Sequence, residues 1–297
     1  MKKISPKKIR ATVAGYLFIS PVIVGMLVFS LVPLIESFYT SFTLYDNVGV
    51  HQFVGFQNYA EMFNMPLFWK AFKNTVVYAC VSIPVNIVCS FFLAWLLNFN
   101  VKGVKIYRAL FYSPCIIPIV ASTVVFADLF NPTFGWFNQI LKAVGLPPYS
   151  FMTKPGTAMP SMIIYSMWSM GGSMLIWLSC FNSIPKELYE AAAIDGANGF
   201  QKLMKFTIPL STPIIFYNLV MGIIGGLQLF AQVYLLTNGG PLDSTLTVVM
   251  MIYNYGINYM EMGIASAMAW FLAIVIVILT AITFITRKYW VYGEEDK

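Results

Sequence analysis

The chain has 297 residues, of which 59% are hydrophobic and 10% charged, with 18 basic against 12 acidic side chains and a mean hydropathy of +0.73. Soluble domains are roughly 45–50% apolar and about 25% charged, so a soluble chain of this composition could not cover its surface with polar groups. Disordered, fibrous and nucleic-acid-binding classes require low hydrophobicity, repeats or clustered charge, and the composition excludes them. We therefore predict an integral membrane protein that contacts membrane lipid and no nucleic acid.

Six stretches are long and apolar enough to cross a bilayer, because a spanning helix needs about 20 largely apolar residues. They cover residues 12–35, 74–97, 108–130, 157–181, 207–230 and 263–286. The first stretch follows basic residues as a signal peptide would, but its apolar run exceeds the usual length of about 7–15 residues. We therefore expect it to be retained, and the sequence predicts an all-α membrane protein with six transmembrane helices.

Basic residues divide unequally between the two sides that six spans would create. The two terminal tails and the connections 98–108 and 182–206 together hold 14 of the 18 lysines and arginines. The opposite side holds only Lys70, Lys73, Lys142 and Lys154. Because positive residues favour the cytoplasmic side of a membrane, we expect both termini and both of these connections to be cytoplasmic.

The spans contain almost no ionisable residues, and this limits the chemistry. Only Arg108 and Asp128 lie within them, both near an end. Ion-coupled carriers commonly place an ionisable residue near the midplane, so this pattern argues against proton coupling, although sodium held by backbone oxygens stays open. An intramembrane enzyme would need clustered His, Asp or Glu side chains, so the pattern favours a pore or a transporter powered by another protein.

Metal, disulfide and nucleotide sites are also disfavoured. The four cysteines lie in apolar stretches without CxxC spacing and are interpreted as small buried hydrophobes, and His51 is the sole histidine. The sequence contains no GxxxxGK[ST] loop, so it predicts no ATP site and no bound cofactor in this chain. Glycines gather at 171–172 and at 222–226, where we favour close helix packing over the alternative of a cavity or hinge.

The connection between the fourth and fifth spans contains a predicted short helix. Ser183 is expected to cap it, with Pro185 and Glu187 in its first turn, and the alanines at 191–193 favour helix. Gly196 is expected to end it in a turn where a Cβ would clash, either through positive φ or through crowding against a partner. This short helix and turn, with small side chains on one face, could insert into a cleft of a partner protein. The alternative interpretation is a surface connector between two spans.

Three short runs in this connection carry a family resemblance: Glu190-Ala191-Ala192, Asp195-Gly196-Ala197 and Ile208-Pro209-Leu210. Together they resemble the EAA loop of ABC importer permeases. Further runs resemble landmarks of the carbohydrate-type, MalF/UgpA-like members: Val54-Gly55-Phe56-Gln57-Asn58-Tyr59, Asn74-Thr75, Trp168-Ser169-Met170-Gly171-Gly172, Ser183-Ile184-Pro185 and Tyr234 to Pro241. The resemblance covers most of residues 15–285.

The resemblance implies a type I ABC importer permease fold in a bacterial or archaeal cytoplasmic membrane. Its domains would be the N-terminus with the first helix and external loop over 1–69, a permease domain over 70–286, and a tail over 287–297. The implied partners are a second permease, an ATPase dimer that uses the ATP, and an extracytoplasmic solute-binding protein. The first helix would pack peripherally on the partner permease, and the transported substrate would be a sugar or oligosaccharide.

We expect a coupling helix over residues 186–199 to dock in a groove on one ATPase, through Glu190, Ala191, Ala192, Asp195, Gly196 and Ala197. Glu190 could pair with a basic ATPase residue or cap a nearby backbone group. The expected substrate path includes Tyr165, Trp168, Ser169 and Gly172, at i, i+3, i+4 and i+7 of one helix. Gln228 and Gln232, an expected i, i+4 pair at the outer end of the fifth span, complete it.

Two other interpretations stay open from the sequence. One is an ABC permease for a different solute, such as a lipid or a glycerol phosphate, although no cationic cluster lies near the proposed path. The other is a passive channel or scaffold subunit, which would have no use for a cytoplasmic coupling knob. Trp, Tyr and Gln in the expected path could equally be interfacial anchors or helix cross-links.

Overall fold

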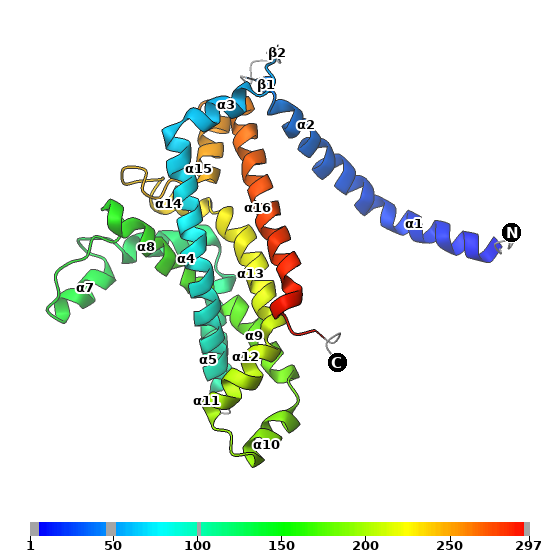
Figure 1. The fold of residues 1–297 in the computed structure, drawn as a ribbon. Helices are drawn as coiled ribbons and strands as arrows, with labels where there is room; N and C mark the ends of the chain where they lie inside the picture. Colours follow the sequence, from blue (N-terminus) through cyan, green and yellow to red (C-terminus); the bar gives the residue numbers. More distant parts are fainter. Residues whose placement is uncertain (1–5, 46–51, 100–101, 294–297) are drawn as a thin grey trace. The chain divides into compact units, whose positions relative to one another are not determined.

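The computed structural model describes residues 6–45, 52–99 and 102–293 and is almost entirely helical (Figure 1). Lys2, Lys3, His51 and Lys297, which entered the charge count or the argument against a metal site, lie outside the described residues. The chain forms two compact units. The first contains Met1–Asn64 and Ile252–Trp270, and the second contains Met65–Met251 and Phe271–Lys297.

The first unit begins with one long helical run. It consists of α1 (Pro6–Met26), a π-helical turn at Leu27–Leu31, and α2 (Val32–Thr40). Residues 14–40 of this run are long and apolar enough to span a membrane, and the most apolar stretch within it has no side chain buried in the protein. Such an exposed apolar helix requires lipid or another protein around it.

A small cap of short elements follows this helix. Strand β1 (Thr43–Leu44) pairs antiparallel with β2 (Gln52–Phe53), and α3 (Gln57–Asn64) comes next. The buried amide of Asn58 donates 2.9 Å hydrogen bonds to the carbonyl oxygens of Ser41 and Thr43. The two carbonyl groups need a hydrogen-bond donor, and the amide of Asn58 supplies it. Asn58 in the run 54–59 therefore has a structural role.

The second unit is organised around α4 (Pro66–Leu97), which packs most extensively against α9 (Gly171–Ser183) and α13 (Thr212–Leu227). Phe91 meets both Trp177 and Phe181 edge to face in its core, and Trp177 Nε1 donates a 3.1 Å hydrogen bond to Ser90 Oγ. The indole is fully buried, so this bond satisfies its one donor.

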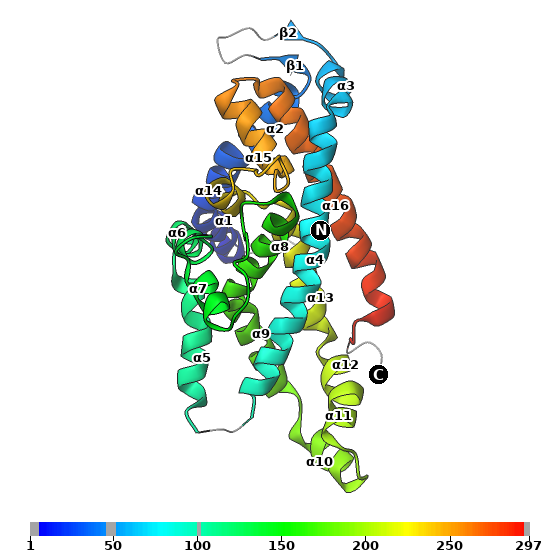
Figure 2. The same ribbon diagram turned by 90° about the vertical axis from the view of Figure 1, so that its left-hand side faces the viewer.

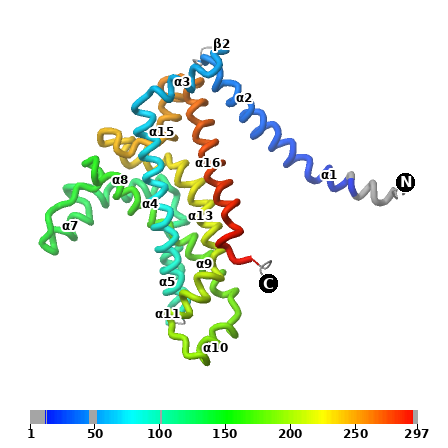
Figure 3. Tube along the Cα trace, viewed as in Figure 1, coloured from blue at the N-terminus to red at the C-terminus, as the bar shows by residue number. Residues whose placement is uncertain are grey.

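Three of the predicted spans are helix pairs with a sharp bend rather than single helices. Figure 3 draws the course of the chain as a tube. The first pair joins α5 (Val104–Tyr112) and its 3₁₀ turn Ser113–Ile116 to α6 (Ile119–Leu129) at 102°. The second joins α8 (Pro155–Ser166) and its 3₁₀ turn Met167–Ser169 to α9 at 49°. The third joins α11 (Gly199–Lys202), a π-helical turn Leu203–Thr207 and α12 (Ile208–Leu210) to α13 at 60°.

Prolines lie at two of these bends. Pro118 places Ile117 before it in extended backbone with ψ 127°, because the residue before a proline avoids the helical region. Pro213 lies in the first turn of α13, where its missing N–H costs no hydrogen bond. Three helices of the described chain could therefore span a membrane alone, and up to six spans exist if each bent pair is one.

The remaining helices are short and lie in the connections. They are α7 (Trp136–Ala143), α10 (Lys186–Ile194), α14 (Ala231–Leu236) and α15 (Val248–Tyr253), the last followed by a π-helical turn at Asn254–Asn258. The chain then enters α16 (Met262–Trp290), the longest uninterrupted helix after α4. Figure 2 shows α10, α11 and the beginning of α5 at the same end of the second unit.

Candidate functional site

A cavity of about 420 Å³ lies within the second unit where two of the bent pairs meet α4 and α13. Its walls come from one face of α4, the bend between α5 and α6, the bend between α8 and α9, and the segment from α13 to α14. The polar and aromatic residues that line it are Tyr78, Ser82, Asn86, Ser122, Tyr165, Ser166, Trp168, Ser169, Ser173, Asn218 and Gln232.

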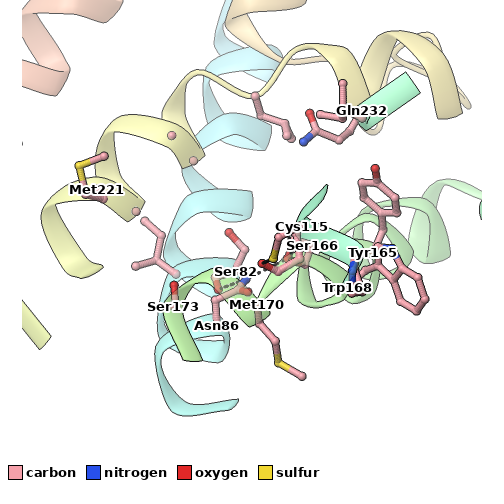
Figure 4. Close-up of a pocket in the computed structure, with 18 of the residues that line it drawn as sticks. Ser82, Asn86, Cys115, Tyr165, Ser166, Trp168, Met170, Ser173, Met221 and Gln232 are labelled. Carbon is pink, nitrogen blue, oxygen red and sulfur yellow. Dashed lines mark hydrogen bonds between the residues drawn. The ribbon is translucent and has the colours of Figure 1, made fainter. Parts of the chain in front are cut away.

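The cavity is polar without being charged. None of its lining residues in the described chain carries a carboxylate or a basic side chain. Figure 4 shows Gln232 facing Ser82, Ser166 and Cys115 across the space. Asn86 donates a 3.0 Å hydrogen bond to Ser166 Oγ, which ties α4 to α8 at the cavity wall. Amides and hydroxyls of this kind can exchange hydrogen bonds with an uncharged polar ligand.

The two aromatic residues of the bend have different roles. Tyr165 is only 6% exposed, and its hydroxyl lies 2.8 Å from Ser122 Oγ and 3.1 Å from Thr123 Oγ1. Its polar end therefore joins α8 to α6 and is already hydrogen-bonded. Trp168 is 43% exposed and meets Phe126 edge to face at 5.3 Å, so its indole has free surface. An aromatic face of this kind packs well against apolar C–H groups.

Four of the six residues expected along a substrate path line this cavity, namely Tyr165, Trp168, Ser169 and Gln232. Gly172 does not line it but lies beside it, where its N–H donates to Cys115 Sγ at 3.1 Å. The expected helical spacing of these residues was only partly correct, because the helix changes to a 3₁₀ turn at Met167–Ser169 and bends before α9.

Gln228 is placed differently from the expectation. It was expected to form an i, i+4 pair with Gln232 on one helix, but α13 ends at Leu227 and α14 begins at Ala231. Phe230 between them has φ −134° and ψ −64°, which is outside the helical region. The pair is therefore wrong as a helical pair, because the backbone turns between its members, and Gln228 does not line the cavity.

Several lining residues were absent from the expected path, and α4 contributes the clearest set. Tyr78, Ser82 and Asn86 follow one another at intervals of four on an otherwise apolar helix. Residues four apart lie on one face of a helix, so this polar stripe was a readable signal. The other polar residues, Ser122, Ser166, Ser173 and Asn218, come from different helices, and no spacing in the sequence connects them.

The clustered glycines serve packing at some positions and the cavity at others. A Cβ on Gly171 would lie 2.1 Å from the carbonyl oxygen of Phe111, and one on Gly222 would lie 2.9 Å from a methyl carbon of Ile83. Gly225 lines the cavity with nothing within 4 Å of a Cβ. Close packing, the favoured interpretation, is confirmed at Gly171 and Gly222, and the cavity alternative holds at Gly225.

The predicted short helix of the 182–206 connection is present as α10. Its capping differs from the expectation: Ser183 is the last residue of α9, and its hydroxyl donates back to Cys180 O at 2.7 Å. Pro185 takes the N-cap position without a side-chain hydrogen bond. The serine prediction was wrong because Pro185 separates it from α10 and Ser183 still continues the preceding helix.

The turn after α10 is tightly hydrogen-bonded. Gly196 has φ +77°, Ala197 N donates to Ala192 O at 2.8 Å, and Gly196 N donates to Ala193 O at 3.1 Å. These two bonds form a Schellman motif, in which a left-handed residue after the helix lets orphan carbonyls be satisfied. The positive-φ expectation for Gly196 is confirmed, and no other residue that the structure describes crowds its Cβ position.

A second cap completes this segment. Asn198 and Gln201 exchange side-chain and backbone hydrogen bonds of 2.8 Å, which is a capping box at the start of α11. Tyr189 and Thr207 lie hydroxyl to hydroxyl at 2.9 Å and connect α10 to the π-helical turn. The connection is therefore a stiff helix–turn–helix rather than a loose loop.

The tip of this helix–turn–helix presents apolar side chains. Ile194 is 87% exposed and Phe200 is 70% exposed, whereas Ala192 is buried against the chain. Glu190 is exposed and makes no hydrogen bond or ion pair with any other residue that the structure describes. Exposed apolar groups beside a free carboxylate are typical of a surface that another protein covers.

Comparison with known proteins identifies the family. Residues 76–290 match the family described as "Binding-protein-dependent transport system inner membrane component". The chain belongs to this permease family. It is 39% identical over 289 residues to the probable ABC transporter permease protein YesP of Bacillus subtilis (strain 168), covering 96% of this chain and 93% of YesP. The resemblance inferred from the EAA-like loop is thus confirmed.

Two further comparisons place the permease among transport subunits. It is 37% identical over 281 residues to the arabinooligosaccharides transport system permease protein AraP of the same organism, covering 91% of this chain and 87% of AraP. A chain of a bacterial alginate ABC transporter, crystallised with alginate pentasaccharide-bound periplasmic protein, matches its fold with a TM-score of 0.84. That match has 25% identity and covers 95% of this chain and 96% of the other.

These relatives are membrane permease subunits, so the chain is the permease component of an ABC transporter and has no ATPase site of its own. No comparison bears on the predicted domain boundaries at residues 69 and 286 or on the roles of individual side chains. The coupling and substrate-path assignments therefore stay predictions.

Proposed function

We propose that this permease carries a neutral sugar or oligosaccharide inward through the cavity between α4, α8 and α13. The observation that supports this most directly is the lining itself, which combines amides, hydroxyls and the exposed indole of Trp168 with no charged side chain. A sugar has hydroxyls for the polar groups and an apolar C–H face for the aromatic ring. The names of the arabinooligosaccharide and alginate relatives support a carbohydrate as the substrate class.

Within that proposal, the path residues divide by role. Trp168 provides the stacking surface, and Ser169 and Gln232 provide hydrogen bonds. Tyr165 shapes the wall, because its hydroxyl is held by Ser122 and Thr123. Gly172 donates its N–H to Cys115 beside the cavity and contributes no side chain to the path. Gln228 lies outside the cavity lining and has no contact with the substrate in this proposal.

The membrane orientation is part of the same proposal. We place six spans across a bacterial or archaeal cytoplasmic membrane, each bent pair being one span, with both termini cytoplasmic. Lys105, Lys186 and Lys205 lie on the elements that gather at one end of the second unit. Arg287 lies in the last turn of α16, with its guanidinium carbon 5.5 Å from the centroid of the Phe216 ring. Positive residues at one end favour placing that end in the cytoplasm.

We further propose that the helix–turn–helix of residues 186–202 transmits movement between this permease and an ATPase. Ile194 and Phe200 would seat in a groove of the ATPase, with Glu190, Ala191, Asp195, Gly196 and Ala197 at the contact and Ala192 holding α10 against the chain. ATP would be bound by the ATPase dimer and by no residue of this chain. The two caps supply the stiffness that transmission requires.

The complete transporter would contain a second permease, two ATPase subunits and an extracytoplasmic solute-binding protein. The exposed apolar helix over residues 14–40 would pack peripherally on the second permease. The apolar surface of that helix needs a cover of lipid or protein in either case.

Transport by the reconstituted complex tests the substrate proposal. The complex containing this chain, in vesicles with its solute-binding protein, should import neutral oligosaccharides at least about tenfold faster than uronic-acid oligosaccharides or glycerol phosphate, because an unpaired buried anion is costly. Trp168→Ala should reduce import of the neutral sugar, and Trp168→Phe should preserve most of it. Equal or faster import of the charged solutes would contradict the neutral-sugar assignment.

Labelling of single cysteines tests the orientation. In a chain whose four native cysteines are replaced by alanine, Glu190→Cys should react with a membrane-impermeant maleimide only from the cytoplasmic side. Lys142→Cys, on the exposed surface of α7, should react only from outside. The reverse pattern would overturn the placement of both connections.

A further inference from the structure

A second cavity of about 420 Å³ lies at the end of the second unit that carries α10, apart from the cavity described above. It is formed where α4 ends, α5 begins, α9 ends and α10 begins. The residues that line it are Asn98, Phe99, Val104, Arg108, Phe181, Asn182, Ile184, Lys186 and Tyr189. Unlike the cavity of the substrate path, it contains basic side chains.

Two cations in this cavity have no carboxylate partner in the part of the chain that the structure describes. Arg108 and Lys186 both line it, and across the described residues no carboxylate lies within ion-pairing distance of either. Arg108 uses one of its nitrogens to donate to Leu97 O at 2.8 Å. Its Nε is buried and donates to no acceptor in the part of the chain that the structure describes. A buried guanidinium N–H without an acceptor is costly, and an anion that binds the other N–H groups of this guanidinium would offset part of that cost.

The rest of the cavity is amphipathic. Phe99, Val104, Phe181 and Ile184 give it apolar walls, while Asn98, Asn182 and Tyr189 add neutral polar groups. The neighbouring α5 exposes Ile106 and Leu110 by more than half of their side chains. A ligand suited to this surrounding has an anionic head and an apolar body. A small soluble anion would leave the apolar walls unused.

We propose that this cavity binds the phosphodiester headgroup of an anionic phospholipid of the inner leaflet. The phosphate accepts hydrogen bonds from the guanidinium group of Arg108 and from the ammonium group of Lys186, and the acyl chains follow the apolar surface of α5. Basic pockets between transmembrane helices on the cytoplasmic side are suited to anionic headgroups. The inference rests on the proposed cytoplasmic placement of this end and is otherwise independent of the transported solute.

The two cations lie on different helices, so a lipid bound to both would connect these helices. Lys186 is the first residue of α10, and Arg108 lies on α5. A phosphate held by both side chains bridges the start of the proposed coupling helix to a membrane-embedded helix. Coupling between ATP hydrolysis and transport should therefore depend on anionic lipid, as a property of this site rather than of surface charge in general.

The test compares the reconstituted complex in vesicles of pure phosphatidylcholine and in vesicles of equal parts phosphatidylcholine and phosphatidylglycerol. The measured quantity is the ratio of sugar-stimulated ATP hydrolysis between the two lipids, together with phosphatidylglycerol retained on the complex in native mass spectrometry. Lys186→Gln and Arg108→Gln should each reduce retention about fivefold and abolish the increase caused by phosphatidylglycerol. Lys205→Gln, an exposed cation outside the cavity, is the matched control and should behave like the unmodified chain.

Three other outcomes overturn the proposal. Equal losses in Lys205→Gln would show that diffuse surface charge attracts the lipid. Activation by inorganic phosphate in pure phosphatidylcholine would assign a soluble anion to the cavity. Equal sugar-stimulated ATP hydrolysis in both lipids would contradict the lipid site and leave the proposed transport function intact. Absence of sugar stimulation in every lipid would instead count against the transport function itself.

Discussion

Gly171 lies directly against the backbone of α5, so closely that an ideal Cβ built on it would be 2.1 Å from the carbonyl oxygen of Phe111. Its neighbour Gly172 has room, since a Cβ there would meet only Cys115 Sγ at 3.8 Å. The two adjacent glycines therefore have different tolerances, although the sequence treats them alike.

We expect Gly171→Ala to destabilise the permease by about 3 kcal/mol, because a backbone carbonyl cannot move aside as a flexible side chain would. Gly172→Ala is the matched control and should change stability little. The measurement is the thermal unfolding midpoint of the purified complex in detergent. Similar midpoints for the two variants would show that α5 and α9 are less closely packed than described.

The two glutamines near the cavity provide a second prediction. Gln232→Ala should raise the KM for sugar uptake about fivefold, because one hydrogen bond to the substrate contributes roughly 1 kcal/mol. Gln228→Ala should leave KM within about twofold, since Gln228 does not line the cavity. Uptake of labelled sugar into vesicles at several concentrations distinguishes the two. A larger effect of Gln228→Ala would place the path elsewhere.

Two substitutions at Gly196 distinguish a requirement for positive φ from a requirement for the absence of a Cβ. Asn adopts positive φ far more readily than Val does, so Gly196→Asn should keep most ATPase association and transport-coupled hydrolysis, and Gly196→Val should lose both. Co-purification of the ATPase and coupled hydrolysis are measured, with membrane insertion as the control. Loss in both variants would indicate crowding of the Cβ by the partner, and no loss in either would favour the surface-connector interpretation.

The segment after α14 is held by side chains of α4, and their contributions should differ. Asn74 donates to the carbonyl oxygens of Asp243 and Leu246 at 2.8 Å and 3.0 Å. Asn74→Ala should therefore reduce stability by about 1–2 kcal/mol, because two carbonyls lose their donor. Lys70→Gln removes a 3.2 Å ion pair with Asp243 whose side chains are roughly half exposed, and should cost about 0.5 kcal/mol or less. Thermal unfolding of both variants in detergent compares the two, and equal losses would contradict this ranking.

Some features of this permease follow from local sequence alone. The apolar stretches predict where helices lie, because any backbone in lipid must satisfy its own hydrogen bonds. The turn at Gly196 was predictable because a helix of good formers followed by glycine leaves carbonyls that a left-handed residue can satisfy. The loop motif around Glu190 and Asp195 indicated the family, because its residues are neighbours in the chain and can be recognised without the fold.

The cavity and its boundaries were decided by tertiary structure. Tyr78, Ser82 and Asn86 form a polar stripe, but only the packing of α4 against two bent helix pairs shows that the stripe faces a shared space with Gln232. The contacts between the bent pairs include close approaches such as Gly171 to Phe111, which join residues 60 positions apart. Periodicity along one helix describes a face, whereas the partner of that face is set by contacts between distant segments, and these are not encoded in any local spacing.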